Sequence, residues 1–292
     1  MAICSLRPSR PRVDGLREAE PDIVATCGKT SRRAHGNVLG GGHPLHMVSA
    51  WATCQRLVPG QKATDAKSNE ISAILLLLER LHLTGALVSI DAAGTQTKIA
   101  RCIAARGAGY LLALKDTQKS LATVVALFFD TPGQRGAARV AIDADHGRVE
   151  IRSHRVSTAV DWQQSDRHAP GEPRFPGLKA IAMLETCIER GGKITTARRF
   201  FLSSLAPDPT RLARARAHWG IENRLHWVPD VVFQGDLMRL KPGDGPKNMA
   251  TIKHMAMNLI RMAPGKASIK TKRKAAGWNQ DHLKAIITQT GK

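Results

Sequence analysis

Two acidic side chains stand where predicted elements could present carboxylates to a ligand. Asp91 ends a short apolar run that predicts a buried strand, and open α/β sheets bind ligands at the carboxyl ends of strands. Glu222 lies four residues from both His218 and His226, so the three share one face of a predicted helix. That spacing is not the H-E-x-x-H zinc pattern. We interpret Asp91 and Glu222 as candidate catalytic carboxylates, with helix capping and a polar helix face as the structural alternatives.

A basic loop follows the first predicted strand. Residues 27–30 read Cys-Gly-Lys-Thr, but a phosphate loop needs a glycine where this chain has Ile23, so that motif is excluded. Lys29, Arg32 and Arg33 nevertheless gather cations where the strand ends. Such a loop favours contacts with DNA phosphates, which position a duplex without reading its sequence.

The overall charge points to a polyanionic partner. The 292 residues carry 44 Lys and Arg against 24 Asp and Glu, a formal net charge of +20. The longest apolar run, Ala73–Leu78, is far shorter than the ~20 residues of a membrane-spanning helix. Five scattered cysteines without C-x-x-C spacing predict neither a zinc ribbon nor a disulfide framework. The composition therefore favours double-stranded DNA as partner, no membrane and a cytoplasmic location.

The elements that would position these residues form an α/β pattern in the first half of the chain. A strand, a helix and another strand predict a parallel α/β unit with a right-handed crossover over 86–115. Three further strands and one helix precede it. The predicted strands are 22–28, 45–52, 56–64, 86–91 and 110–115, and the predicted helices are 71–83 and 95–106.

The second half of the chain predicts a β-rich insertion followed by helices. The insertion covers about residues 116–205, and the next helix is expected to kink or end at Pro229. Residues 1–22 read as a basic leader and 264–292 as a solvated basic tail, which leaves 23–263 as the main domain. Within these regions we expect strands over 149–156, 178–189 and 198–203, and helices over 121–129, 211–228 and 247–263.

Eight stretches, in order, resemble one protein family, the bacterial insertion-sequence transposases of the ISAs type, also called H-repeat-associated proteins. The most specific is His218-Trp-Gly-Ile-Glu-Asn-Arg-Leu-His-Trp227, followed by Asp230-Val231. The resemblance covers roughly residues 23–290. The other seven are Cys27–Arg33, Leu45–Ala52, Lys67–Ile71, Val88–Gly94, Leu112–Lys115, His146–Arg148 and Phe201–Leu205.

The resemblance implies a ribonuclease-H-like fold with a β-rich insertion before the catalytic helix. It also implies two aspartates and a glutamate that hold two divalent cations, Mg²⁺ or Mn²⁺, for in-line attack on a phosphodiester. By motif matching, Asp91 takes the place of the second aspartate and Glu222 that of the glutamate, as catalytic and metal-binding residues. The expected DNA-binding residues are Lys29, Arg32, Arg33, Lys115, His218 and Arg224.

The chain departs from the family pattern at the first aspartate, where it has Cys27. A thiol is a soft ligand that suits Mg²⁺ poorly, and losing one ligand is expected to lower the rate about a thousandfold or more. Asp22 lies five residues upstream, on the other face of a strand, and cannot substitute.

Further departures give the chain the look of a truncated and degenerate copy. The family's leading helical domain has no counterpart in residues 1–26, and Pro229 stands where the catalytic helix would continue. Gly235-Asp236 replaces an acidic pair, and Asp116-Thr117 replaces a Gly-Asn pair.

Three hypotheses follow from these features. The first is a DNA transposase by descent that binds insertion-sequence ends, with impaired or lost catalysis and a possible homo-oligomeric, nucleoid-associated state in a bacterial cytoplasm. The second is a non-catalytic DNA-binding remnant or a repressor of intact transposase copies. The third is a nuclease of the same fold acting through Asp91, Glu222 and a further carboxylate that the sequence does not identify.

Overall fold

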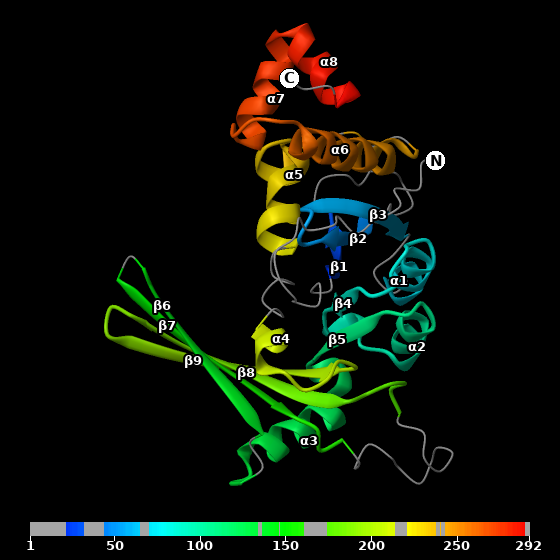
Figure 1. The fold of residues 1–292 in the computed structure, drawn as a ribbon. Helices are drawn as coiled ribbons and strands as arrows, with labels where there is room; N and C mark the ends of the chain where they lie inside the picture. Colours follow the sequence, from blue (N-terminus) through cyan, green and yellow to red (C-terminus); the bar gives the residue numbers. More distant parts are fainter. Residues whose placement is uncertain are drawn as a thin grey trace, which may run out of the picture. The chain divides into compact units, whose positions relative to one another are not determined.

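The computed structural model describes residues 22–31, 44–64, 70–133, 136–145, 147–160, 174–213, 221–237, 240 and 243–289. By internal contacts the chain divides into two compact units. The first unit combines Asp22–Leu81 with Trp219–Lys292, and the second unit is His82–His218. Both units mix strands with helices (Figure 1). No helix among the described residues is long and apolar enough to cross a membrane.

The first unit is built on a three-stranded antiparallel sheet. Its strands are β1 (Ile23–Thr30), β2 (His46–Ala52) and β3 (Leu57–Thr64), in the order β3-β2-β1. Every residue of β2 is buried, which is expected for the central strand of a sheet covered on both faces. The three strands predicted from apolar runs are thus confirmed. Helix α1 (Glu70–Glu79) follows β3 and ends earlier than predicted.

The segment predicted as one helix over 211–228 is more irregular. It begins with α4 (Pro209–Ala213), which belongs to the second unit. After residues outside the described part, a π-helix, η6 (Ile221–His226), leads directly into α5 (Trp227–Val231), and the 3-10 turn η7 (Gly235–Leu237) comes next.

Pro229 was expected to kink or end the helix; it does not end it, because it lies inside α5, two residues after the π-helix η6 gives way to α-helix. In a π-turn the partner of the residue 229 nitrogen would be the carbonyl of Arg224, and proline has no N–H to donate. The guanidinium of Arg261 donates to that carbonyl instead. The Arg224 carbonyl is therefore not left without a donor. Along this segment Trp227 is 54% exposed, whereas Leu225 is fully buried.

Helix α6 (Gly245–Met262) covers the edge strand β3 through one asparagine. The Asn258 side chain accepts from the Val58 N–H and donates to the Val58 carbonyl, both at 2.9 Å. A buried backbone group left without a partner is costly. Asn258 therefore replaces the neighbouring strand that β3 lacks on this side.

Replacing Asn258 with leucine is expected to lower the free energy of unfolding by about 2–3 kcal/mol, since two backbone groups lose their partners. Urea denaturation of the purified chain measures this loss. The matched control is Thr251→Ala on the same helix, where the hydroxyl pairs with Gln61 in an exposed position and little stability should be lost. Equal losses in the two variants would contradict the role given to Asn258.

The basic C-terminal residues form two helices, and most of their cations are exposed to solvent, as expected. Helices α7 (Ile269–Trp278) and α8 (Gln280–Thr288) pack on α6 (Figure 1). Lys272 is buried and donates to the Ala263 carbonyl at 2.5 Å, and Arg273 donates to the Val232 carbonyl. The last carbonyls of a helix have no partner within the helix. Lys272 and Arg273 supply hydrogen-bond donors to two such carbonyls.

The second unit begins with the predicted strand–helix–strand crossover. Strands β4 (Leu87–Ile90) and β5 (Gly109–Leu114) are parallel, and α2 (Thr97–Ala105) connects them. A short 3-10 turn, η2 (Ala92–Gly94), follows β4. The parallel α/β unit predicted from the sequence is confirmed.

The β-rich region continues the β4–β5 sheet. After η3 (Asp116–Gln118) and α3 (Lys119–Asp130), four long antiparallel strands follow, and the last of them pairs with β5. Figure 1 shows them as one twisted ribbon in green and yellow-green. The strands are β6 (Ala137–Asp145), β7 (Arg148–Ser157), β8 (Ala180–Arg190) and β9 (Lys193–Ser203), in the order β5-β9-β8-β7-β6.

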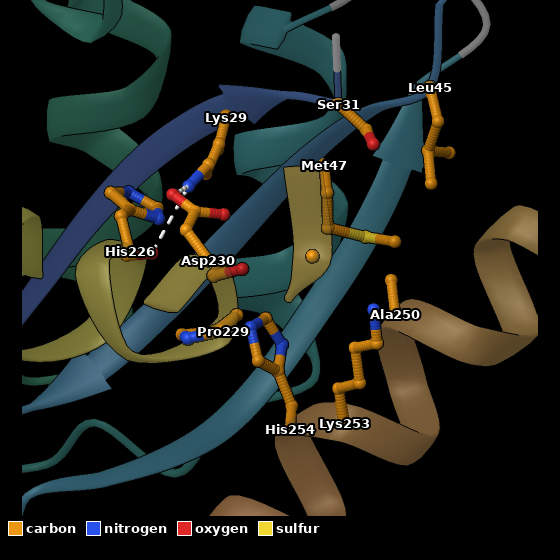
Figure 2. A pocket seen from close by; sticks show the side chains of 12 residues that line it. Lys29, Ser31, Leu45, Met47, His226, Pro229, Asp230, Ala250, Lys253 and His254 are labelled. Carbon is orange, nitrogen blue, oxygen red and sulfur yellow. Dashed lines mark hydrogen bonds and ion pairs between the residues drawn. The ribbon is translucent and has the colours of Figure 1, made fainter. Parts of the chain in front are cut away.

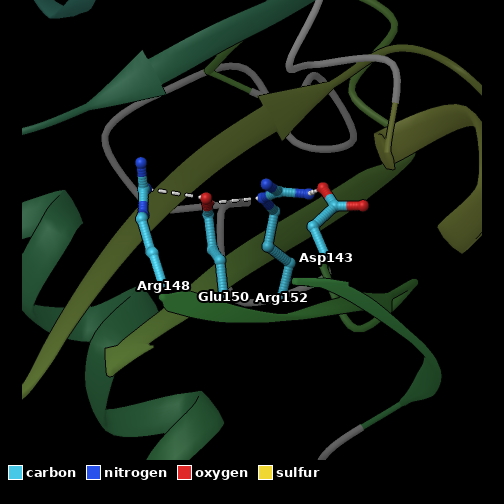
Figure 3. A network of polar contacts seen from close by, with 4 residues as sticks. All are labelled: Asp143, Arg148, Glu150 and Arg152. Atoms are coloured by element: carbon cyan, nitrogen blue, oxygen red, sulfur yellow. Dashed lines mark hydrogen bonds and ion pairs between the residues drawn. The ribbon is translucent and has the colours of Figure 1, made fainter. Parts of the chain in front are cut away.

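One face of this ribbon carries a chain of charges centred on Arg152 (Figure 3). The Arg152 guanidinium donates to Glu150 and to Asp143, each at 2.6 Å, and Arg148 donates to Glu150 at 2.7 Å. Positions 148, 150 and 152 point to the same side of β7, and Asp143 is the register partner of Glu150 on β6. Two facing carboxylates are thus held together by a buried arginine.

Candidate functional site

The side chain of Cys27 lies in an apolar layer of the first unit. Ala25, Cys27 and Lys29 alternate along β1 and so point to one face of the sheet. Cys27 is 9% exposed and belongs to a cluster with Trp51, Ile221 and other apolar residues. The position that resembles a catalytic aspartate therefore holds a buried thiol.

The helical segment η6–α5 covers this face of β1. Ile221, Leu225 and Val228 are buried in the same cluster as Cys27. Glu222 follows Ile221 in the chain; its backbone is in η6, and its side chain lies outside the described part. The structure thus brings position 27 and the segment of Glu222 together within one unit, as the resemblance implies.

Lys29 is bound inside the first unit. Its ammonium group forms an ion pair with Asp230 and donates to the His226 carbonyl at 3.1 Å (Figure 2). The two side chains of the ion pair remain 29% and 25% exposed, so water still reaches them. Lys29 ties β1 to α5, and the contact with DNA phosphate expected for it stays a prediction.

A small cavity of about 80 Å³ opens beside this ion pair. His254 faces it in Figure 2, and burial, with the charges of Arg261 and Lys29, lowers the pKa of that imidazole to about 4. His254 is therefore neutral at pH 7, and it is hydrogen-bonded to Gln61. The cavity lining is Lys29, Ser31, Leu45, Met47, Ser49, His226, Pro229, Asp230, Gly235, Ala250, Lys253 and His254.

Asp91 lies in the second unit, directly after β4, as predicted. Its Oδ1 accepts from the Gly94 N–H at 3.4 Å and caps η2, so the capping alternative is present in the structure. A hydrogen bond of this length is weak. Capping therefore leaves the carboxylate able to take a further ligand, and its catalytic role stays a prediction.

A buried polar group against Gly28 and Thr30, on the other face of β1 from Cys27, was not found by sequence reasoning. His46 on β2 is 3.2 Å from the Glu70 carboxylate, and its other ring nitrogen is 2.8 Å from the Thr30 hydroxyl. A Cβ on Gly28 would come within 3.0 Å of the His46 ring and the Glu70 carboxylate, so a side chain at position 28 would displace one of them. The only signal in the sequence was the acidic residue at the start of the predicted helix.

The remaining predicted DNA-binding residues are divided between the described and undescribed parts. Lys115 is exposed after β5, and Arg224 is exposed on η6. The other three, Arg32, Arg33 and His218, lie outside the described residues. The basic character of Lys115 and Arg224 is compatible with the DNA contacts predicted for them, which stay predictions.

The thiol at position 27 does not suit a site for two Mg²⁺ ions. No group of three His, Cys, Asp or Glu in the described part of the chain could hold a metal ion. Position 27 offers sulfur within an apolar cluster, whereas Mg²⁺ requires oxygen ligands. The residue that does not suit Mg²⁺ is therefore Cys27, on strand β1.

Comparisons with known proteins give a consistent family. The family model described as "Transposase DDE domain" matches residues 23–259. The H repeat-associated putative transposase YhhI of Escherichia coli is 31% identical over 281 residues, 93% of this chain and 73% of that protein. The putative transposase YncI of Escherichia coli O157:H7 is 34% identical over 274 residues, 91% of this chain and 69% of that protein.

Two further matches, one to a protein sequence and one to a solved structure, cover a smaller share of the matched chain. An uncharacterized protein of Xanthobacter autotrophicus is 40% identical over 191 residues, 64% of this chain and 62% of its own length. A solved structure of the piggyBac transposase synaptic complex with hairpin DNA aligns with 91% of this chain and 52% of its own, at 8% identity and a TM-score of 0.43.

The family match settles the fold class. It spans most of the chain, and the DDE domain has the ribonuclease-H-like fold that the resemblance implied. The mixed α/β architecture of both units agrees with it, so the predicted fold class is confirmed. Because the motifs, the elements and the family match coincide over residues 23–259, this chain belongs to the family of transposases with a DDE domain.

Proposed function

We propose that this chain is a DNA-binding transposase domain of an insertion sequence whose strand-cleavage step is impaired at Cys27. The observation that carries the proposal is the buried thiol on β1 at the position of the first catalytic aspartate. The net charge of +20 supports binding of a polyanion. In this proposal the chain keeps the basic charge and the fold of a DDE transposase, but it has Cys27 where the family has its first metal-binding aspartate.

The finer parts of the proposal concern partner, metal and location. The ligand would be double-stranded DNA at insertion-sequence ends, bound by a chain that can form a homo-oligomer near the bacterial nucleoid in the cytoplasm. Asp91 and Glu222 would be the carboxylates that remain for Mg²⁺ or Mn²⁺, which in this family polarise the phosphodiester. Residues 23–263 would form the catalytic domain, with the β-rich insertion at about 116–205.

In this proposal the chain's own residues position DNA. Lys115 and Arg224 would meet backbone phosphates from exposed positions, and Lys29 would hold η6–α5 against β1 through Asp230. A chain that occupies DNA ends without cutting them would also repress intact copies. The thiol of Cys27, which suits Mg²⁺ poorly, therefore also favours a second candidate function, repression of intact transposase copies.

The purified chain is expected to bind duplex DNA but to leave it uncut. Binding is measured by fluorescence anisotropy, and nicking by conversion of supercoiled plasmid carrying insertion ends, with Mg²⁺ or Mn²⁺ added. Asp91→Asn is the control, and it should bind as tightly and nick as little as the unaltered chain. Robust metal-dependent nicking that Asp91→Asn abolishes would refute the loss of catalysis and favour a nuclease, while absence of DNA binding would refute the function itself.

A further inference from the structure

Three arginines from separate segments of the first unit meet beside the buried ring of Trp51. Arg56 lies in the turn between β2 and β3, Arg224 in η6 and Arg261 near the end of α6. The Arg261 guanidinium carbon lies 4.5 Å from the centroid of the Trp51 ring, a distance at which cation and ring attract. The stacking fixes the guanidinium in place.

Arg261 also fixes the backbone of the other two arginines. It donates to the Arg56 carbonyl at 2.7 Å and, from its second terminal nitrogen, to the Arg224 carbonyl. Both carbonyls therefore lie within reach of a single planar guanidinium. The side chains of Arg56 and Arg224, which are exposed, start from neighbouring points of the surface.

The charges of this cluster are not balanced by described carboxylates. Each of the eight ion pairs found in the described part of the chain joins other residues. Burial, together with the charges of Arg56 and Arg224, lowers the pKa of Arg261 to about 10. Arg261 therefore remains charged at pH 7, and an anion bound between cationic side chains that lie this close would be stabilised.

The backbone of Arg56 gives an independent reason to look for a ligand here. Its φ is +57°, in the left-handed region that glycine adopts without strain. A long cationic side chain at such a position adds strain to the turn, and strained residues gather at binding sites. Glycine would satisfy this turn better, but it would remove the charge.

We propose that Arg56 and Arg224 form a binding site for backbone phosphates of duplex DNA, with Arg261 as the positioning residue. The guanidinium group suits this ligand because its planar array of donors matches phosphate oxygens. The inference rests on the proposed DNA binding and adds the surface of the first unit through which it occurs. Arg224 was predicted from the family resemblance, whereas Arg56 and Arg261 come from the structure.

The experiment compares Arg56→Gln, Arg224→Gln and the double variant with Arg80→Gln. Arg80 is exposed at the end of α1 in the same unit, so the control removes the same charge from another surface. Affinity for an insertion-end duplex and for an unrelated duplex is measured by anisotropy between about 50 and 200 mM salt. Melting temperatures of all variants are measured in parallel.

Each single variant is expected to weaken binding to both duplexes by about three- to tenfold and to reduce the salt slope by about one. The double variant should reduce the slope by about two, while Arg80→Gln leaves it unchanged. Arg261→Lys keeps the charge but cannot hold both carbonyls, so it should weaken binding to both duplexes even at temperatures where its melting curve shows the variant folded, and an unchanged affinity there would refute the positioning role.

The outcomes separate this inference from the proposed function. If the unaltered chain binds DNA and the double variant keeps its salt slope, the arginine site is refuted while DNA binding stands. If the unaltered chain binds neither duplex, both proposals fall together.

Discussion

Cys27→Asp is expected to raise metal-dependent nicking of duplex DNA by at least about a thousandfold over the unaltered chain. The substitution returns an oxygen ligand and a negative charge to β1, opposite the helical segment that carries Glu222. A plasmid-nicking assay with Mg²⁺ or Mn²⁺ measures the change. Asp91→Asn in the Cys27→Asp background should abolish the regained activity.

The same variant has a predicted cost in stability, which provides a second measurement. Cys27 packs among apolar residues such as Trp51 and Leu225, and an unpaired carboxylate in such surroundings is strongly unfavourable. The melting temperature of Cys27→Asp should therefore fall without metal and rise again with Mg²⁺ or Mn²⁺. The unaltered chain should show no comparable dependence on metal.

Cys27→Ser is the matched control for this prediction. Serine supplies an oxygen of similar size without a negative charge, so neither nicking nor metal-dependent stability should appear. If Cys27→Asp folds and binds DNA yet does not nick, the buried thiol is not the sole cause of the lost activity.

Much of the fold could be predicted because its buried strands appear in the sequence as continuous runs of apolar residues. The run ending at Asp91 and the run from Tyr110 give the parallel pair β4–β5, and the glycines after each helix confirm where the chain turns. Strand β6 was missed for the opposite reason. It exposes Val140 and Ile142 on one side and carries Asp143 on the other, so it shows no buried run.

Only those residues of the candidate site that belong to a short sequence motif could be predicted. Cys27 and Asp91 follow from short motifs, and the structure places Cys27 on β1 and Asp91 directly after β4. Lys29 and Asp230 are 201 positions apart, and no local pattern connects them. Pairings of this kind depend on how η6–α5 packs on β1, which the sequence does not encode in any short window.

The fate of the basic C-terminal residues illustrates the same limit. Lysines and arginines in a run predict a solvated segment, yet Lys272 and Arg273 donate to carbonyls left by other elements. Burial of an amphipathic cation depends on a nearby acceptor, and acceptors at helix ends are visible only once the fold is known.

Arg152→Met is expected to lower the free energy of unfolding by about 2–3 kcal/mol, because it leaves the largely buried Glu150 carboxylate without its partner, whereas Asp143 is 56% exposed and screened by water. The Arg152 side chain is 7% exposed and lies between Glu150 and Asp143. These carboxylates face each other across β6 and β7, where like charges repel. Denaturation followed by hydrogen exchange in β6–β9 measures the loss where it arises.

Two further variants show whether the loss comes from the charges left behind. Arg148 also pairs with Glu150, but its side chain is 47% exposed. Arg148→Met should therefore lower the free energy of unfolding by less than about 1 kcal/mol. The double variant Glu150→Gln with Arg152→Met removes both buried charges, so it should be more stable than Arg152→Met alone. If the double variant is instead the less stable of the two, Arg152 stabilises the ribbon by packing and not by neutralising the carboxylates that face each other across it.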